Sequence, residues 1–232
     1  MKNSSPAPPD GQRTPTRGSL VRPRRAGYVP GWLIGPHGPP EHPMSEEDEE
    51  LEFDLTLFPT PVLRKRAAEV TDFGPELEAT VQAMYRRMYA SEGVGLAAPQ
   101  VGLKQRILVA NHTGEPGDEL TLINPRILER SGAPTTFEEG CLSFPGIFAE
   151  VERPDGCRVE AQGLDGEKFE AEYEGFLSRV VQHEYDHLEG VLLVDRMSPA
   201  DKHRHRHALD ALKDRYKREQ AKLKAEAGRA RR

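Results

Sequence analysis

The pattern H-E-x-x-H occurs once in this sequence, in residues 182–187 (QHEYDH), inside a segment that reads as helix. Residues four apart in a helix lie on one face, roughly 6 Å apart along the axis. His183 and His187 can therefore direct two imidazoles at one metal ion. Glu184 lies beside them, where a carboxylate can reach a water held by that metal. The alternative interpretation is a polar helix face with no metal.

The third metal ligand separates the possible enzyme classes. In one class of zinc protease the pattern continues as H-E-x-x-H-x-x-G-x-x-H, and this chain matches as far as Gly190 but has Leu193 in place of the last histidine. Other zinc proteases use a downstream Glu, but the Glu residues beyond 200 fall in a charged segment typical of solvent exposure. Upstream, Cys141 lies in a glycine-containing loop that can expose its sulfur. One thiolate and two imidazoles would leave a fourth position open for water, which is typical of catalytic sites.

Three separated segments resemble the three motifs of the peptide deformylase family. They are residues 93–100 (GVGLAAPQ), 139–143 (EGCLS) and 182–188 (QHEYDHL), in the family's order and spacing. The likeness extends from about Leu57 to about Pro199, and no position that the family uses for chemistry departs from its pattern. The resemblance implies a metallohydrolase that removes the formyl group from the N-terminal formylmethionine of nascent polypeptides.

The resemblance also implies a role for each residue of the reaction centre. Cys141, His183 and His187 would hold one divalent metal ion, typically Fe²⁺ in this family, although Zn²⁺, Ni²⁺ and Co²⁺ suit the same ligands. The metal would lower the pKa of its water, and Glu184 would act as general base and then general acid. The Gln100 amide and the Leu142 backbone N–H would stabilise the oxyanion.

The residues expected to contact the substrate are Val94, Gly95, Phe137, Glu139, Phe176 and Val180. By resemblance, the backbone near Gly95 pairs with an extended peptide, whereas the alternative is a plain turn glycine. Phe137, Phe176 and Val180 would line a pocket for the methionine side chain, and Val180 lies one helical turn before His183. Ordinary core residues are the alternative for these three.

Glu139 is also expected to form a pair with Arg153 that braces the Cys141 loop, because ligands held by outer partners are better oriented. A solvent-exposed ion pair is the alternative. Cys157 lies in an alternating stretch and fits a small buried hydrophobic residue. Two cysteines without an export signal predict no disulfide partner and a reducing compartment.

Residues 1–54 are predicted to be a disordered extension, rich in proline and then acidic. The first 43 residues contain half of the 20 prolines, with six Lys or Arg against two acidic residues. No signal-peptide or transmembrane run is present, which favours a cytoplasmic protein. Organelle targeting by this Arg-rich segment is the weaker alternative, and Met44 is an alternative start.

Residues 55–199 are the expected catalytic domain, and helical and strand patterns alternate within it. Residues 75–90 are predicted as a helix, with Pro75 in its first turn. Short apolar segments at 106–110, 120–128, 148–151, 158–161 and 168–173 are predicted as strands, with a hairpin signal at Asp165-Gly166. This order indicates an α+β fold, with mixed or antiparallel sheets packed around the H-E-x-x-H helix.

Residues 200–232 are predicted to form a basic C-terminal helix that begins at Ser198-Pro199. Residues 201–232 carry twelve Lys or Arg against five Asp or Glu, whereas the whole chain has a net charge of −6. Such a segment is either a solvated helix or a contact for a polyanion such as ribosomal RNA. A zinc endopeptidase and a ribosome-associated binding module that has lost catalysis are the alternative functions.

Overall fold

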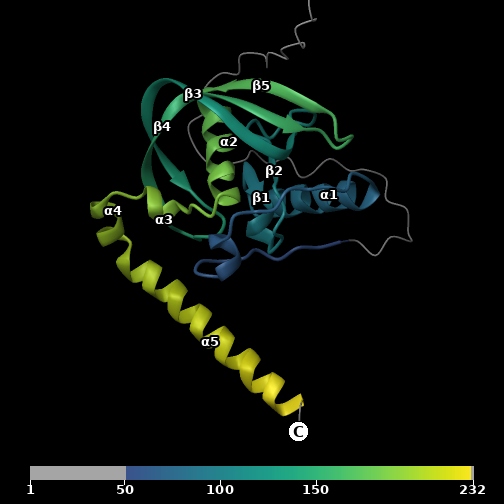
Figure 1. Ribbon diagram of the computed structural model, residues 1–232. Helices are drawn as coiled ribbons and strands as arrows, with labels where there is room; N and C mark the ends of the chain where they lie inside the picture. Colours follow the sequence, from purple (N-terminus) through teal and green to yellow (C-terminus); the bar gives the residue numbers. More distant parts are fainter. Residues whose placement is uncertain (1–50, 231–232) are drawn as a thin grey trace, which may run out of the picture.

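The computed structural model describes residues 51–230, which form an α+β fold around a single five-stranded antiparallel sheet (Figure 1). The strands, adjacent in chain order, are β1 (Gly95–Ala97), β2 (Ile107–Ala110), β3 (Leu120–Gly140), β4 (Phe148–Gln162) and β5 (Lys168–Glu174). The predicted fold class is confirmed. Among the described residues the only parallel pairing is an isolated bridge between Ala68 and Gln105, so the sheet is antiparallel rather than mixed.

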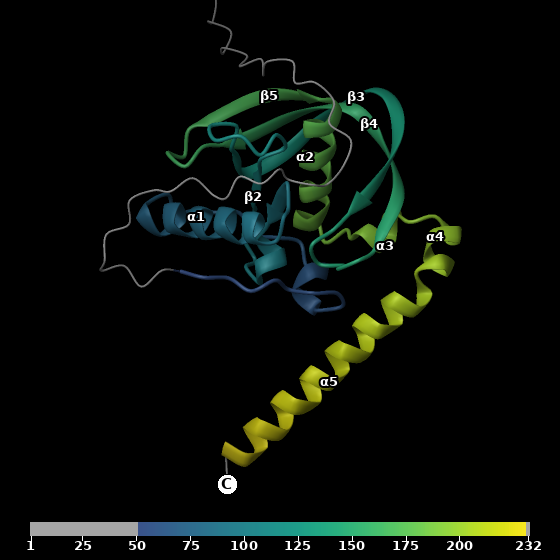
Figure 2. The same cartoon turned by 180° about the vertical axis from the view of Figure 1, so that it is seen from behind.

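One helix, α2 (Gly175–Leu188), lies at the centre of the fold, and the other helices lie around the sheet (Figures 1 and 2). The other helices are η1 (Pro61–Arg64), α1 (Pro75–Ala90), η2 (Ala98–Val101), α3 (Leu193–Arg196), α4 (Pro199–Arg204) and α5 (Arg206–Ala230). The curved β3–β4 ribbon wraps one side of α2, while β1, β2 and α1 lie on the other side (Figures 1 and 2). The prediction of a central H-E-x-x-H helix is therefore confirmed.

The strands are longer than the sequence pattern predicted. The expected strand at 120–128 continues to Gly140, and the two expected at 148–151 and 158–161 are one strand. Pro125 lies inside the strand predicted at 120–128, whereas Pro134 and Gly156 lie in stretches for which no strand was predicted. In the structure the β3–β4 register shifts between Ile123 and Arg126 and between Ser131 and Pro134, so bulges accommodate two of these residues within the ladder.

Helix α2 is buried on almost all sides. Val181 and Leu188 pack in a cluster with strand residues such as Leu108 and Val159. The helix ends where Gly190 adopts a φ of +73°. A side chain there would lie 2.7 Å from the Arg64 carbonyl oxygen, so both the conformation and the close approach require glycine.

The expected extension 1–54 lies mostly outside the described residues, because residues 1–50 are not described. Residues 51–54 have no regular secondary structure, but Phe53 packs against the core cluster that contains Leu77 and Met84 of α1. Residues 51–54 therefore include a side chain that packs against the domain.

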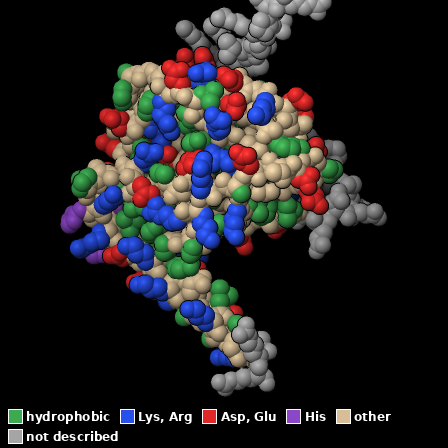
Figure 3. Space-filling model, viewed as in Figure 1, with side chains coloured by type: hydrophobic (Ala, Val, Ile, Leu, Met, Phe, Trp, Pro, Cys, Tyr) green, Lys and Arg blue, Asp and Glu red, His purple; other side chains and the backbone are tan. Residues whose placement is uncertain are grey.

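The basic C-terminal segment is helical as predicted, but it forms two helices, α4 and α5, separated at His205. Ser198 caps α4 by accepting a 3.0 Å hydrogen bond from the Asp201 amide. Helix α5 contacts the domain near its start, through buried Leu209 and half-buried Leu212, and then projects away with Lys and Arg side chains along it (Figures 1 and 3). Among residues 51–230, no helix is both long enough and apolar enough to cross a membrane.

Candidate active site

Three side chains from two distant segments form a cluster that can hold a metal ion. The ligand atoms of Cys141, His183 and His187 all lie within 4.8 Å of one another. Cys141 Sγ lies 3.2 Å from His187 Nε2, and the two imidazole rings lie one turn apart on α2, with centroids 5.3 Å apart. The helical spacing thus brings the two histidines together, as predicted.

The loop between β3 and β4 carries Cys141 to the helix. The backbone pairing of Gly140 with Phe148 closes this loop, and two turns inside it place buried Phe144 and Ile147 in an apolar cluster with Leu192. These anchors leave the Cys141 sulfur facing α2.

Glu139 braces the first histidine. Its Oε2 lies 2.9 Å from His183 Nδ1, and both its oxygens accept hydrogen bonds from Arg153, at 2.7 and 3.0 Å. Burial acts to raise the pKa of Glu139, but the hydrogen bonds from His183 and Arg153 hold it well below its usual range. The Glu139–Arg153 pair is buried, so the interpretation as a solvent-exposed pair is wrong.

The two histidines differ in their surroundings. Burial acts to lower the pKa of His183, but hydrogen bonds with Cys141 and Glu139 raise it well above its ordinary value. Burial lowers the pKa of His187 well below its ordinary value. The Glu139 contact occupies His183 Nδ1 and leaves Nε2 of that ring for a metal ion, and His187 Nε2 lies 3.2 Å from the cysteine sulfur.

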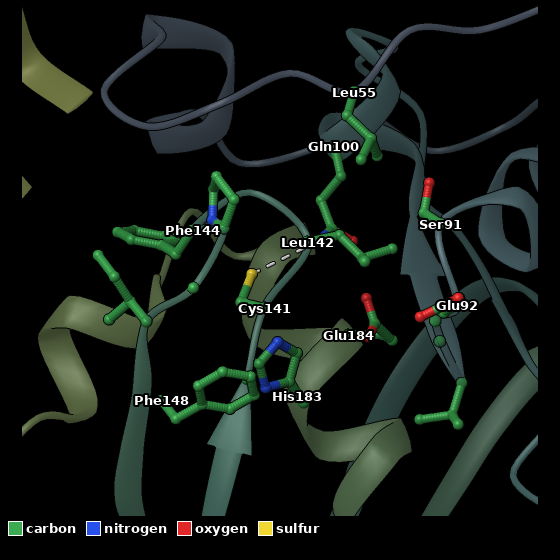
Figure 4. A pocket seen from close by; sticks show the side chains of 17 residues that line it. Leu55, Ser91, Glu92, Gln100, Cys141, Leu142, Phe144, Phe148, His183 and Glu184 are labelled. Carbon is green, nitrogen blue, oxygen red and sulfur yellow. Dashed lines mark hydrogen bonds between the residues drawn. The ribbon is translucent and has the colours of Figure 1, made fainter. Parts of the chain in front are cut away.

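Glu184 is a buried carboxyl group beside this cluster. Burial raises its pKa to about 7, and its Oε2 is buried without a hydrogen-bond partner. In Figure 4 the carboxylate points into the pocket, between the backbone that carries Glu92 and the side chain of Cys141. An unpaired carboxylate beside one thiolate and two imidazoles fits a site for a divalent metal and a water.

Gln100, in η2, is held in one orientation. Its Oε1 accepts a 2.7 Å hydrogen bond from the Ala97 amide, so its NH₂ group must point the other way. That nitrogen lies 3.6 Å from Cys141 Sγ, at the edge of the cluster (Figure 4). The side-chain amide is therefore a donor fixed beside the metal ligands.

These groups line a pocket of about 490 Å³ whose wall is mostly apolar. Besides the site residues Gln100, Cys141, Leu142, His183 and Glu184, its lining includes Leu55, Ser91, Glu92, Val94, Gly95, Phe144, Ile147 and Phe148. Phe148, at the start of β4, is 42% exposed and stands next to His183 in Figure 4. Phe148 was not predicted as a pocket residue, because its only local signal is its place two residues after Gly146.

Gly95 is required by close packing rather than by a turn. A side-chain carbon there would lie 2.6 Å from Glu184 Oε1 and 2.8 Å from Val180 Cγ1. At Gly93 such an atom would lie 2.8 Å from Leu142 Cδ1. Neither residue has a positive φ, so the plain-turn interpretation does not account for them.

The expected substrate-contacting residues divide into two groups. Val94 and Gly95 line the pocket, whereas Phe137, Phe176 and Val180 do not. Val180 and Phe176 pack in a small apolar cluster with Val94, and the Phe137 and Phe176 rings lie 6.1 Å apart. Glu139 is fully buried and contacts His183, as expected of a residue that positions a metal ligand, and its expected contact with substrate stays a prediction.

Comparison with known proteins gives a consistent result. The family model "Polypeptide deformylase" matches residues 53–203. Peptide deformylase 1B of Arabidopsis thaliana is 43% identical over 176 residues, which cover 74% of this chain and 64% of that protein. Peptide deformylase of Thermotoga maritima is 49% identical over 148 residues, which cover 64% of this chain and 88% of that protein.

Solved structures agree with the sequence relatives. A crystal structure of peptide deformylase from Plasmodium falciparum superposes with a TM-score of 0.69 at 41% identity, covering 71% of this chain and 97% of that one. A structure of Arabidopsis thaliana peptide deformylase 1B with an inhibitor gives 0.69 at 42% identity, covering 73% and 93%. This chain belongs to the polypeptide deformylase family.

Proposed function

We propose that this protein is a metal-dependent peptide deformylase that hydrolyses the formamide of N-terminal formylmethionine in nascent polypeptides. The observation that carries this proposal is the Cys141–His183–His187 cluster, with the unpaired carboxylate of Glu184 beside it in an apolar pocket. We assign residues 55–199 to the catalytic domain and residues 200–232 to a basic tail.

Cys141, His183 and His187 would hold the ion. When bound, it supplies Lewis acidity that makes a water nucleophilic near neutral pH and polarises the formyl oxygen. Fe²⁺ is our expectation in the cell, with Zn²⁺, Ni²⁺ and Co²⁺ as substitutes, because a thiolate and two imidazoles suit all four. The buried hydrogen bond between Glu139 and His183 would hold one ligand in place before any ion binds.

Glu184 would move the protons of the reaction. A pKa of about 7 lets the group accept a proton from the attacking water and return it to the leaving amine at similar cost. Its unpartnered Oε2 is available for this transfer, because no protein donor occupies it.

Gln100 and Leu142 would stabilise the charge that develops on the formyl oxygen. The Ala97 amide fixes Gln100 so that its NH₂ group faces the ligand cluster without rearrangement. Leu142 directly follows the cysteine, so its backbone N–H lies in the same loop. Preorganised donors of this kind each lower such barriers by about 3–4 kcal/mol.

The substrate would bind in an extended conformation along Val94 and Gly95, with its methionine side chain against the apolar wall of the pocket. Val180, on α2, packs against Gly95. Phe176 packs in the cluster with Val180, and the Phe137 ring lies next to that of Phe176. We therefore assign Phe137, Phe176 and Val180 to the support beneath the substrate rather than to the pocket lining.

We place the enzyme in the cytoplasm, where the basic tail can meet ribosomal RNA. One relative is chloroplastic or mitochondrial, so an organelle remains the specific alternative. Fractionation of the native cell followed by immunodetection of the protein would decide between the two compartments.

The reaction is tested by mass spectrometry on a short formyl-Met peptide incubated with anaerobically purified, Fe²⁺- or Ni²⁺-loaded protein. We expect a single product, the same peptide with a free N-terminal amine, and equimolar formate. An unformylated peptide should stay intact. Cleavage inside either peptide would instead favour a zinc endopeptidase, and metal-loaded protein that leaves both intact would favour a binding module.

A further inference from the structure

Arg179 is a buried arginine on α2, one turn before His183, and the reaction outlined above gives it no part. Its Nη1 donates to Glu139 Oε1 at 2.7 Å and to the Val151 carbonyl at 2.9 Å. Its Nη2 donates to the carbonyl and the hydroxyl of Thr135, at 2.6 and 2.9 Å. These four bonds fix the guanidinium between α2 and strands β3 and β4.

The two oxygens of Glu139 have different partners. Oε1 accepts from Arg153 Nε and from Arg179 Nη1, both at 2.7 Å. Oε2 accepts from Arg153 Nη2 at 3.0 Å and lies 2.9 Å from His183 Nδ1. Each carboxylate oxygen has two lone pairs. The guanidinium groups therefore fill Oε1 and leave one lone pair of Oε2 for the imidazole N–H.

Arg179 and Arg153 are not equivalent in this network. Arg153 also donates to Asp186 on α2, at 2.9 Å, and so links the helix to the sheet. Within residues 51–230, the polar contacts of Arg179 run to Glu139, Thr135 and Val151, and its guanidinium lies 5.7 Å from the Phe137 ring centre. Burying a second guanidinium against one carboxylate is expensive in desolvation, so charge balance alone does not account for it.

We propose that Arg179 is a positioning residue for the metal centre. By holding Oε1, it fixes the rotation of the Glu139 carboxylate so that Oε2 faces His183 Nδ1. That hydrogen bond in turn directs His183 Nε2 at the space it shares with Cys141 Sγ and His187 Nε2. The proposal rests on the metal site but not on the reaction performed there.

The test measures metal binding by Arg179→Met. Zn²⁺ affinity is obtained by competition with a chromophoric chelator, and the visible absorption of the Co²⁺ protein reports the ligand geometry. We expect Zn²⁺ to bind about 10-fold more weakly or worse, with a changed Co²⁺ spectrum. Wild-type affinity together with a wild-type Co²⁺ spectrum would overturn the proposal.

Arg106→Met is the matched control. Arg106 is also buried against α2, where it donates to Glu189 at 2.7 Å and stacks on Tyr185, but it does not touch Glu139. Its loss should reduce stability toward urea while Zn²⁺ affinity stays within about twofold of wild type. If Arg106→Met weakens Zn²⁺ as much as Arg179→Met does, the effect belongs to loss of any buried arginine, and the proposal fails.

A double-mutant cycle separates positioning from general support. If Arg179 acts through Glu139, then Arg179→Met should cause no further loss of Zn²⁺ affinity in a Glu139→Gln background. Additive losses would contradict the proposal. Should Arg179→Met fail to fold, Arg179→Gln keeps one donor in the site. It is tested by the same metal-binding measurements, the same Arg106→Met control and the same double-mutant cycle. None of these measurements uses formate release, so failure of this proposal can be distinguished from failure of the proposed reaction.

Discussion

At the scale of single residues, the absent side chain of Gly95 sets how closely strand β1 approaches the catalytic helix. Any Cβ there would overlap Glu184 Oε1 and Val180 Cγ1. The carboxylate that we assign as proton carrier can therefore lie directly against the strand along which the substrate is proposed to bind. Chemistry and substrate alignment depend on the same close contact.

Replacing Gly95 by Ala should displace Glu184 and lower kcat by about 10- to 100-fold, because an error of about 1 Å in a catalytic group has effects of this size. The crowded methyl group should also destabilise the fold by about 1–3 kcal/mol. Steady-state kinetics with metal analysis of the same sample checks this. Gly228→Ala, where nothing lies within 4 Å, is the control and should leave kcat unchanged.

Gln100→Leu should lower turnover while metal content stays at the wild-type level. The substitution removes the donor that is proposed to stabilise the oxyanion, at a cost of about 3–4 kcal/mol in the barrier. Loss of metal from this variant would show instead that Gln100 supports the ligand set through its contact with Cys141.

Side chains that helical spacing places together could be predicted from the residues alone, whereas several that tertiary contacts place together could not. His183 and His187 share a helix face, so their spacing alone indicates a ligand pair. Phe148 and Arg179 have no such signal, because their partners Gly140 and Glu139 are brought to them by strand pairing and helix packing. Phe137 and Phe176 were expected to contact the methionine side chain; their rings lie 6.1 Å apart outside the lining of the pocket of about 490 Å³, and their contact with substrate stays a prediction.

At the scale of elements, the caps of the helices were readable in advance, whereas the length of the central strands was not. Pro75 opens α1, and the helix ends at Ala90 as the apolar spacing indicated. Strand β3 was predicted only as far as Leu128, because a local pattern does not show that β4 pairs along the whole of β3 with bulges that absorb Pro125 and Pro134.

The cap of α4 gives a stability prediction. Ser198→Ala removes the acceptor for the Asp201 amide and should destabilise the protein by about 1 kcal/mol. Urea unfolding measures the change, and exchange of the Asp201 amide hydrogen should quicken. Ser131→Ala, at an exposed position, is the control and should stay within about 0.5 kcal/mol of wild type. Equal effects at the two sites would show that the cap has no special role.

At the scale of the whole molecule, the described residues connect the catalytic domain to the basic helix near the start of α5, through Leu209 and Leu212. Beyond Leu212 the described side chains of the helix are mostly exposed, and its ion pairs, such as Arg215 with Glu219, are internal to it. The sequence predicted this helix and its charge, but its partner is still a hypothesis.

Deleting residues 214–232 should therefore leave kcat/KM on short peptides unchanged and reduce affinity for ribosomes at least about tenfold, with a shallower dependence on salt. Sedimentation with purified ribosomes at several salt concentrations measures this. Equal binding by the truncated and full-length proteins would exclude the tail as the contact. A fall in peptide turnover would show that the tail also supports the domain.

The central claim is that one metal held by Cys141, His183 and His187 works with Glu184 on a formamide. The most direct measurement is metal content and formate release, taken together, from wild type and Glu184→Ala. We predict one metal per chain in both proteins and formate from the wild type alone. Formate release by metal-loaded Glu184→Ala at the wild-type rate, or none from metal-loaded wild type, would contradict the account.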